Sequence, residues 1–539
     1  MTLHGKSIVA GRIAEAAGPA FCASDRTTGA ALAPDFFEAL PADIDAAATA
    51  SASAFAEYKS AGPETRARLL EAIASEIEAL GDALLQRCHL ETGLPLTRLQ
   101  GERARTCSQL RLFAHVVREG SWVDARIDPA LPARQPLPRP DLRRMLQPIG
   151  PVSVFGASNF PLAFSVAGGD TASALAAGCP VVFKAHPAHP GTCELVGGAV
   201  TRAVASVGLP AGLFSLLHGG AAIGGAMVRH PAITAVGFTG SHGAGRALFD
   251  AAAARPRPIP VFAEMSSVNP MFLLPGALAE RGAAIAQGLV TSFTLGTGQF
   301  CTKPGLVFAA EGDATTAFLG ELDKAVASAP AGVMLTAAIC ESFKKGRDQM
   351  LKLPGVTLRA SATIPTGAAS DSQAAALVLT TGADFLRTPA LAHEVFGPFA
   401  IVVIVKSADE MRACSRALEG QLTATLHGTP DDLAESRALL AELEQRVGRL
   451  LLNGFPTGVE VSPAMNHGGP YPATTDVRFT SVGTAAMLRF ARPVCYQGFP
   501  AALLPEALRD ENPLGLLRLV DGRHTRDPVA PPHAASRVS

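Results

Sequence analysis

Apolar positions recur along the chain at two different periods, which predict helices in one region and strands in another. Between residues 64 and 90, apolar side chains return every three or four positions, which predicts an amphipathic helix with Leu69, Leu70, Ile73, Ile77 and Leu80 on its inner face. A second helix is expected from about residue 103 to 117. Farther along, short apolar runs alternate with longer stretches of helical composition. The runs predicted as strands are 152–155, 181–183, 213–217, 234–238 and 261–263, and the helical stretches between them are 162–177, 193–207, 223–228 and 244–254.

Strands that alternate with helices indicate a mostly parallel sheet covered on both faces. A second alternation runs from about residue 283 to 436, with strands expected at 306–309, 375–379 and 400–405. The fold class is therefore α/β with at least two units. In such sheets ligands bind at the carboxyl ends of the strands, so the loops that follow the strands are where function is sought.

Proline interrupts this pattern in two places. Residues 125–140 contain five prolines and cannot form a helix interior or a central strand, so we expect an arm or linker. Residues 524–539 are polar and proline-rich, which favours a mobile tail. Residues 145–169 carry no charge, but their prolines and glycines are typical of a buried strand–turn–helix rather than of a membrane span.

Charge and cysteine usage narrow the class of protein. Lys and Arg number 46 against 47 Asp and Glu, so no long-range field favours nucleic acid or an anionic membrane. The nine cysteines are scattered without a closely spaced pair, which predicts neither a disulfide framework nor a metal site and suits a reducing cytoplasm. Residues 1–11 lack the apolar core of a secretory signal.

Four short segments could carry chemistry. Cys301 ends residues 293–301 (FTLGTGQFC), whose glycines let the backbone approach a ligand, and a thiol is a strong nucleophile when its pKa is lowered. Glu264 follows a predicted buried strand and could act as a general base toward water. Asn159 lies at a strand end and could donate to an oxyanion. Residues 240–245 (GSHGAG) open a predicted helix and could bind an anion.

Each of these residues also has an ordinary structural interpretation. A lone cysteine is more often a small buried apolar residue than a nucleophile. Glu264 could equally cap a helix or form a salt bridge, and Asn159 taken alone is more typical of a turn. The glycine-rich turn is weak evidence unless strand and helix flank it.

Taken together and in chain order, the motifs resemble those of the aldehyde dehydrogenase superfamily over nearly the whole chain. They are Asn159-Phe160-Pro161, residues 184–187 (KAHP), 238–241 (FTGS), 264–270 (EMSSVNP), 298–301 (GQFC) and 394–398 (EVFGP). The resemblance implies a Rossmann-like cofactor domain, an α/β catalytic domain and a small oligomerisation element. It also implies oxidation of an aldehyde to a carboxylic acid through a thioester on the cysteine.

The resemblance assigns roles by position. Cys301 would be the nucleophile, Glu264 the base for the hydrolytic water, and Asn159 with the Cys301 backbone N–H the oxyanion hole. Lys184 and Glu394 would hold ribose hydroxyls and Phe396 would position the nicotinamide. The remaining assignments are Gly240, Ser241 and Gly245 to the cofactor and Phe160 to the substrate, with no metal.

Two departures from the family pattern bear on the cofactor and the base. Many NAD-specific members of the family carry a glutamate three residues after the cofactor lysine, and this chain has Pro187 there. The position therefore lacks the carboxylate that would repel a 2′-phosphate, and His186 and His189 lie nearby. NADP is thus expected to be accepted and preferred over NAD. Residues 265–268 (MSSV) replace the usual sequence after the glutamate, but the acid itself is kept.

The flanking segments resemble bacterial α-ketoglutaric semialdehyde (2,5-dioxovalerate) dehydrogenases. These are residues 91–95 (ETGLP), 101–106 (GERART), 109–114 (QLRLFA), 467–476 (HGGPYPATTD) and 492–497 (RPVCYQ). In this family the helix near residue 103 lines the substrate tunnel, and Arg105 would face inward to bind a distal carboxylate. A solvent-facing arginine remains an equal alternative.

Three other functions fit the same motifs less well. A fatty aldehyde dehydrogenase would have an apolar tunnel, and a non-catalytic member would lack the thiol or the base. A cysteine hydrolase would use His393 or His467 as its base and would need no nicotinamide.

The resemblance also predicts the domain boundaries. Residues 1–124, 147–262 and 442–466 are expected in the cofactor domain, 263–441 in the catalytic domain, 125–146 and 467–505 in the oligomerisation element, and 506–539 in a C-terminal tail. A homodimer or homotetramer is expected.

Overall fold

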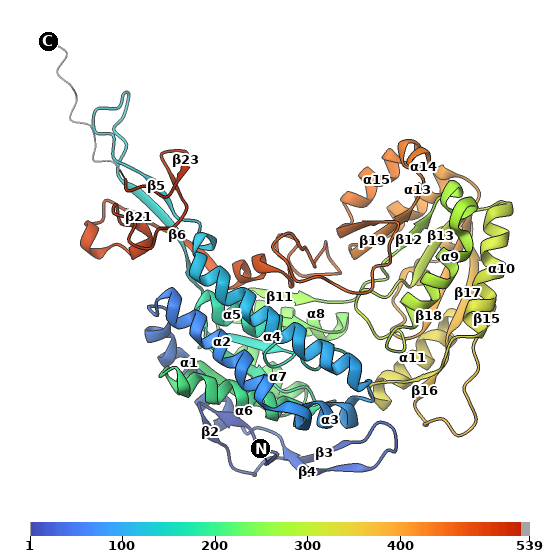
Figure 1. Ribbon diagram of the computed structural model, residues 1–539, viewed down its shortest axis with the longest axis horizontal. Coiled ribbons are helices and arrows are strands. Elements are labelled where there is room, and N and C mark those ends of the chain that lie inside the picture. The colour runs from blue at the N-terminus through green and yellow to red at the C-terminus, as the bar shows by residue number, and fades with distance from the viewer. Residues whose placement is uncertain (1, 530–539) are drawn as a thin grey trace.

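The computed structural model describes residues 2–529 and contains two α/β units and a projecting arm (Figure 1). The first unit holds the N-terminal half of the chain, and the second lies beside it on the right of the view. The arm extends from the first unit and carries the C-terminal end of the described chain.

The first unit is built on a seven-stranded sheet in the order β11-β10-β7-β8-β9-β1-β2. Strands β7 to β11 run parallel, and the short β1 and β2 add an antiparallel edge. The strands are β1 (Ile8–Val9), β2 (Arg12–Ile13), β7 (Val152–Phe155), β8 (Val181–Lys184), β9 (Phe214–Leu217), β10 (Ala235–Thr239) and β11 (Val261–Glu264). A separate hairpin is formed by β3 (Ala20–Ser24) and β4 (Ala31–Phe37).

Helices cover both faces of this sheet, which explains why its central strands read as continuous apolar runs. Every residue of β7, β9, β10 and β11 is buried. The helices are α1 (Pro41–Tyr58), α2 (Pro63–Ala79), α3 (Gly81–Thr92), α4 (Leu96–Glu119), α5 (Gly169–Ala177), α6 (Pro190–Ser206), α7 (Ala221–Arg229) and α8 (His242–Ala253). Lys184 and Glu264 are the last residues of their strands, so both lie at the edge where ligands are expected.

The second unit has its own seven-stranded sheet in the order β15-β17-β18-β13-β12-β19-β20, parallel except for β15. Its strands are β12 (Met271–Leu273), β13 (Leu306–Ala310), β15 (Thr357–Ser361), β17 (Ala376–Thr381), β18 (Phe399–Val405), β19 (Gln421–His427) and β20 (Val447–Leu452). Its helices are α9 (Pro275–Thr294), α10 (Asp313–Ala327), α11 (Ala337–Met350), α12 (Gly382–Arg387), α13 (Ala408–Ala417), α14 (Pro430–Glu435) and α15 (Arg437–Glu444). The strands β14 (Gly332–Val333) and β16 (Ser372–Gln373) pair separately.

The arm is a five-stranded sheet in the order β21-β6-β5-β22-β23. It consists of β5 (Arg126–Asp128), β6 (Leu142–Pro148), β21 (Ala491–Gln497), β22 (Arg518–Val520) and β23 (Arg523–Thr525). Leu508 and Leu516 belong to its core, and the buried Arg518 donates to the carbonyl of Ala507. Residues 506–529, expected in a C-terminal tail, therefore pack into the arm; the remainder of that tail lies outside the described residues.

Three expectations from the sequence differ from the structure. Residues 447–452, expected in the cofactor domain, form β20 of the second sheet. The helix expected at 162–177 begins only at Gly169, and turns occupy residues 161–166. Residues 467–481, expected in the oligomerisation element, lie along β11, where Met265 N–H donates to the carbonyl of Ala473. Among the described residues, no helix is long and apolar enough to cross a membrane.

Candidate active site

Cys301 lies on the loop that follows α9, and the loop's shape depends on glycine. Thr297 has a φ of 59° and Gly298 a φ of 66°, so the chain turns sharply just before the thiol. A Cβ on Gly298 would lie 2.3 Å from the carbonyl carbon of Gly397, a contact that backbone cannot relieve. The thiol itself is half-buried. The turn thus presents the sulfur while pressing its own backbone against the loop that contains Gly397.

Two further contacts fix this loop. The side-chain amide of Asn269, in the 264–270 motif, donates to the carbonyl of Cys301 at 2.9 Å and to that of Lys303 at 3.0 Å. The fully buried Lys303 Nζ donates to the carbonyls of Val395 and Phe399, each at 2.9 Å. The nucleophile loop is therefore bonded to the 394–398 segment as well as packed against it.

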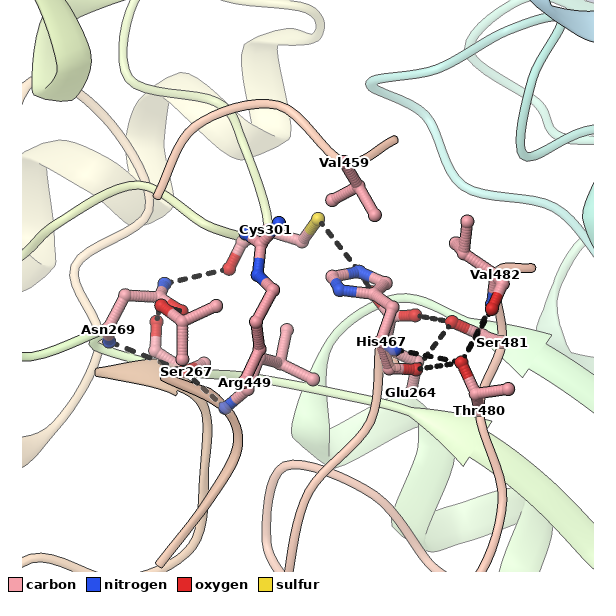
Figure 2. A network of polar contacts seen from close by, with 12 residues as sticks. Glu264, Ser267, Asn269, Cys301, Arg449, Val459, His467, Thr480, Ser481 and Val482 are labelled. Atoms are coloured by element: carbon pink, nitrogen blue, oxygen red, sulfur yellow. Dashed lines mark hydrogen bonds and ion pairs between the residues drawn. The ribbon is translucent and has the colours of Figure 1, made fainter. Parts of the chain in front are cut away.

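Glu264 faces Cys301 from the end of β11, and His467 joins them (Figure 2). His467 Nε2 lies 2.8 Å from Glu264 Oε1 and 3.6 Å from Cys301 Sγ. Ser481 Oγ donates to the other carboxylate oxygen, Oε2. Glu264 and His467 are both buried. The structure thus brings together the predicted nucleophile and the predicted base, and adds a histidine in contact with both.

The protonation of this cluster follows from its partners. Burial alone would raise the pKa of Glu264, but His467 first, and then Ser481 and Arg489, lower it below its usual value. An ionised carboxylate only accepts hydrogen bonds, so His467 Nε2 must carry the hydrogen that it shares with Glu264. His467 Nδ1 is buried and has no hydrogen-bond partner in the described structure. His467 is therefore a donor here and does not offer Nε2 as a base.

This geometry argues against the cysteine-hydrolase alternative. His467 donates rather than accepts at Cys301, and His393, the other histidine considered, is exposed. Burial raises the pKa of the Cys301 thiol well above its usual value, and the charges of Glu264 and Glu394 raise it further. Arg105 is the group that lowers it. In this state the sulfur is protonated at neutral pH.

Asn159 reaches the same loop from the other side. Its side-chain amide donates to the carbonyl of Gln299 at 2.9 Å, which joins the 159–161 segment to the nucleophile loop. An amide nitrogen carries two hydrogens, so the second stays free for a substrate oxygen.

Arg98 of α4 ties the two loops together. Its guanidinium donates to the carbonyl of Asn159 and lies 5.0 Å from the ring centre of Phe160 and 4.8 Å from that of Phe300. The two rings come from the residues next to Asn159 and Cys301. The ring of Phe160, the predicted substrate residue, thus contacts both the Arg98 guanidinium and the neighbouring ring of Phe164.

Arg105 lies on the same helix, and its charge lowers the pKa of the Cys301 thiol against the effect of burial. Its guanidinium lies 5.3 Å from the ring centre of Phe164, and Nη2 donates to the carbonyl of Val459 at 3.4 Å. Its Nη1 is buried without a partner in the described structure. Arg449 donates to the same loop at the carbonyl of Pro456, 2.8 Å away. Neither arginine has an ion-pair partner among residues 2–529.

The predicted cofactor residues lie at the ends of β8 and β10 and on the 394–398 segment. Burial lowers the pKa of Lys184 to about 8, and no carboxylate pairs with it among the described residues, which leaves it to bind a ligand oxygen. Gly240 precedes α8, and Ser241 caps it by accepting from the Ala244 N–H at 3.4 Å. A Cβ on Gly245 would lie 2.8 Å from Met265.

Glu394 and Phe396 are half-buried beside the nucleophile loop, and burial raises the pKa of Glu394. A lysine without a carboxylate partner among the described residues, a helix N-terminus whose Gly240 and Gly245 have no room for a Cβ, and an acid near the thiol loop fit a dinucleotide. His186 and His189 do not supply the positive charge that was expected from them. Burial lowers the pKa of His186 well below its usual value and that of His189 to about 4, and His189 points inward to the carbonyl of Ala157. Pro187 is exposed, as a residue facing a ligand would be.

Comparison with known proteins gives a consistent picture. Residues 24–478 match the aldehyde dehydrogenase family. The chain is 55% identical to alpha-ketoglutaric semialdehyde dehydrogenase 2 of Azospirillum brasilense, over 97% of this chain and 100% of the relative. It is 47% identical to alpha-ketoglutaric semialdehyde dehydrogenase of Acinetobacter baylyi, over 97% of this chain and 99% of the relative.

Solved structures share the fold at lower identity. Aldehyde dehydrogenase C of Pseudomonas syringae, in complex with NAD+ and octanal, has a TM-score of 0.78 at 21% identity, covering 93% of this chain and 98% of that one. A 3,6-anhydro-L-galactose dehydrogenase complex has a TM-score of 0.78 at 20% identity, covering 91% and 99%. The family match over residues 24–478 and the two relatives matched over nearly their full length show that the chain belongs to the aldehyde dehydrogenase family.

Proposed function

We propose that this enzyme oxidises α-ketoglutaric semialdehyde to α-ketoglutarate with NADP or NAD as the oxidant. Two relatives that match almost the full chain carry the name of this activity. The observation that carries the substrate assignment is Arg105, a cation with an unpartnered buried N–H close to the reacting thiol. A guanidinium binds a carboxylate through two parallel hydrogen bonds. A fatty aldehyde would leave that donor without a partner.

The first step forms a bond between Cys301 Sγ and the aldehyde carbon. The thiol must lose its proton, and Glu264 is the nearest base because His467 Nε2 already carries a hydrogen. The His467 N–H, 3.6 Å from the sulfur, can then turn from the newly protonated acid to the thiolate and stabilise its charge. His467 thus acts as a hydrogen-bond donor to the reacting sulfur.

The aldehyde oxygen becomes an alkoxide during this attack. We assign its binding to the free N–H of the Asn159 amide and to the backbone N–H of Cys301. Removing one such donor typically costs about 3–4 kcal/mol of transition-state stabilisation. When bound, the oxidised nicotinamide supplies the hydride acceptor and a positive charge beside the thiol. Lys184, Glu394 and Phe396 would hold it there.

The second half of the reaction hydrolyses the thioester on Cys301. Before this step Glu264 releases to solvent the proton that it took from the thiol. A water then attacks the acyl carbon, Glu264 takes the water's proton, and the carbon–sulfur bond breaks to give the acid and the thiolate. The low pKa of Glu264 keeps the carboxylate ionised for this step at neutral pH. Ser481 and His467 hold its two oxygens, so the group is oriented before the water arrives.

For the cofactor, we propose that NADP is preferred. Pro187 places no carboxylate where the 2′-phosphate would lie, and Lys184 is the cation at that end of β8. The two histidines add no charge, so the preference rests on the absence of repulsion. We further propose a homodimer or homotetramer assembled through the arm.

The experiment is a comparison of substrates and cofactors. Reduced-nicotinamide formation is measured with α-ketoglutaric semialdehyde, succinic semialdehyde and a long-chain aldehyde, each with NAD and with NADP. We expect the largest kcat/KM for α-ketoglutaric semialdehyde and a larger value with NADP than with NAD. A preference for the long-chain aldehyde would contradict the substrate proposal, and a preference for NAD would contradict the cofactor proposal.

A further inference from the structure

Three metal-binding side chains meet at the thiol, and they come from three separate segments of the chain (Figure 2). Cys301 Sγ, His467 Nε2 and Glu264 Oε1 all lie within 4.8 Å of one another. In the dehydrogenase reaction the sulfur and the acid react and the imidazole only donates hydrogen bonds, so the reaction gives His467 Nε2 no role as a ligand. Sulfur, imidazole and carboxylate are the three ligand types that zinc takes in proteins.

The spacing of these atoms is close to that of a tetrahedral zinc site. Zinc binds sulfur at about 2.3 Å and nitrogen or oxygen at about 2.0 Å. At a tetrahedral angle these bonds place sulfur and nitrogen about 3.5 Å apart, and nitrogen and oxygen about 3.3 Å apart. The structure has 3.6 Å between Sγ and Nε2 and 2.8 Å between Nε2 and Oε1. Sγ and Oε1 lie within 4.8 Å of each other, so the ion is admitted when the His467–Glu264 pair opens slightly and Sγ and Oε1 come to about 3.5 Å.

We propose that the cofactor-free enzyme binds one Zn²⁺ through Cys301 Sγ, His467 Nε2 and Glu264 Oε1, and that the ion reversibly inhibits the enzyme by occupying its nucleophile. Cys301 is only partly buried, so water can supply the fourth ligand. Ser481 orients the carboxylate by bonding its other oxygen, as an outer partner does in zinc proteins.

The protons balance as follows. Binding takes the proton of the thiol to solvent, and the hydrogen on His467 Nε2 moves to Nδ1 so that Nε2 can bind the metal. One proton is released in total. The thiolate and the carboxylate cancel the charge of the ion, so the occupied site is neutral, whereas the empty site carries the single negative charge of Glu264. Binding therefore adds one positive charge to the site, which favours the nearby Glu394 and opposes Arg105 and Arg489.

The affinity is limited by one missing contact. His467 Nδ1 has no hydrogen-bond partner in the described structure, whereas a zinc-bound histidine usually donates its second N–H. Loss of such an outer partner typically costs about 10–100-fold in metal affinity. The site is therefore weaker than a structural zinc site and is emptied by a chelator. Affinity rises with pH by about tenfold per unit while the thiol is protonated, because one proton is released.

The test uses Co²⁺, which reports thiolate ligation by a near-ultraviolet charge-transfer band. Untagged, reduced, cofactor-free full-length enzyme is titrated with Co²⁺ and then with Zn²⁺. We expect the band at one ion per chain and its loss on adding Zn²⁺. It should be absent in Cys301→Ser and at least tenfold weaker in affinity in His467→Phe, while Cys22→Ser and Cys495→Ser, which remove exposed thiols elsewhere, keep it.

A second measurement keeps the proposal falsifiable if a variant folds poorly. Zn²⁺ should protect Cys301 of the wild-type enzyme from iodoacetamide, read by mass spectrometry of its peptide, and EDTA should reverse the protection. The proposal is overturned if the wild type shows no thiolate band, if Cys301→Ser keeps it, or if Zn²⁺ leaves the alkylation rate unchanged. None of these readouts uses an aldehyde, so they stand apart from the substrate proposal.

Discussion

Replacing His467 by phenylalanine removes the N–H that lies 2.8 Å from the Glu264 carboxylate. Burial of Glu264 would raise its pKa, and His467 is the first of the groups that oppose the effect of burial. A hydrogen bond to a charged group contributes about 1.5–3 kcal/mol. Since one pKa unit corresponds to about 1.36 kcal/mol, we expect the pKa of Glu264 to rise by about 1–2 units in the variant.

The sign of the effect on the reaction follows directly. Glu264 acts as its ionised form, which is present above its pKa and lost as the pH falls through it. A higher pKa therefore moves the acidic limb of the pH profile upward by about 1–2 pH units, toward neutral pH. The assay is the pH dependence of the thioester hydrolysis rate, separated from acylation by the pre-steady-state burst of reduced nicotinamide.

Two variants serve as controls. His467→Gln keeps an N–H donor of similar reach and should restore much of the acidic limb. His393→Phe changes an exposed histidine and should leave the profile unchanged. If His467→Phe folds with an unaltered Tm and its acidic limb stays where the wild type has it, the assignment of His467 as the group that holds the Glu264 pKa down is refuted.

Four further outcomes are expected. Arg105→Ala should raise KM for α-ketoglutaric semialdehyde by about 10–100-fold, the loss of one charge-assisted interaction, and leave a simple aldehyde unaffected; equal losses on both substrates would refute its role. Pro187→Glu should lower kcat/KM for NADP by at least about tenfold through repulsion of the 2′-phosphate, with NAD little changed. Arg98→Met should lower kcat about tenfold at constant KM, because a hydrogen bond and two ring contacts are lost, and Arg98→Lys should recover part of it; a rise in KM instead would make Arg98 a substrate-binding group. Without cofactor, alkylation of Cys301 should accelerate about tenfold per pH unit across the neutral range because its pKa is raised; a plateau near pH 7 would show a thiolate already present.

The strands and helices of the first unit could be predicted because apolar periodicity records burial. The runs at 152–155 and 261–263 correspond to β7 and β11 because both faces of the sheet are covered. Helix α5 starts later than expected because the apolar residues 162–168 are buried as turns rather than as a helix. In the second unit, β12 has only three residues and β20 is partly exposed, so neither shows a clear apolar run in the sequence.

The chemistry of the site could be predicted only where a residue lies in a recognisable motif. Cys301, Glu264 and Asn159 were found in this way. The place of His467 beside them was not, because residues 467–481 have no periodicity and reach Glu264 through backbone pairing at Thr474. The sequence signal for a close approach at this point was the pair of glycines that follows His467. The structure explains the second, Gly469, because a Cβ there would lie 2.1 Å from the carbonyl oxygen of Gln421.

The contact between Gly298 and Gly397 has a mechanical consequence. With no side chains between them, and with Lys303 bonded to the carbonyls on either side of the segment, the loop that bears the sulfur and the loop that bears Glu394 and Phe396 form one rigid piece. A dinucleotide that shifts the second loop must carry the thiol with it. Any movement of Glu394 and Phe396 is then passed on to Cys301, so a ligand that contacts one loop acts on both.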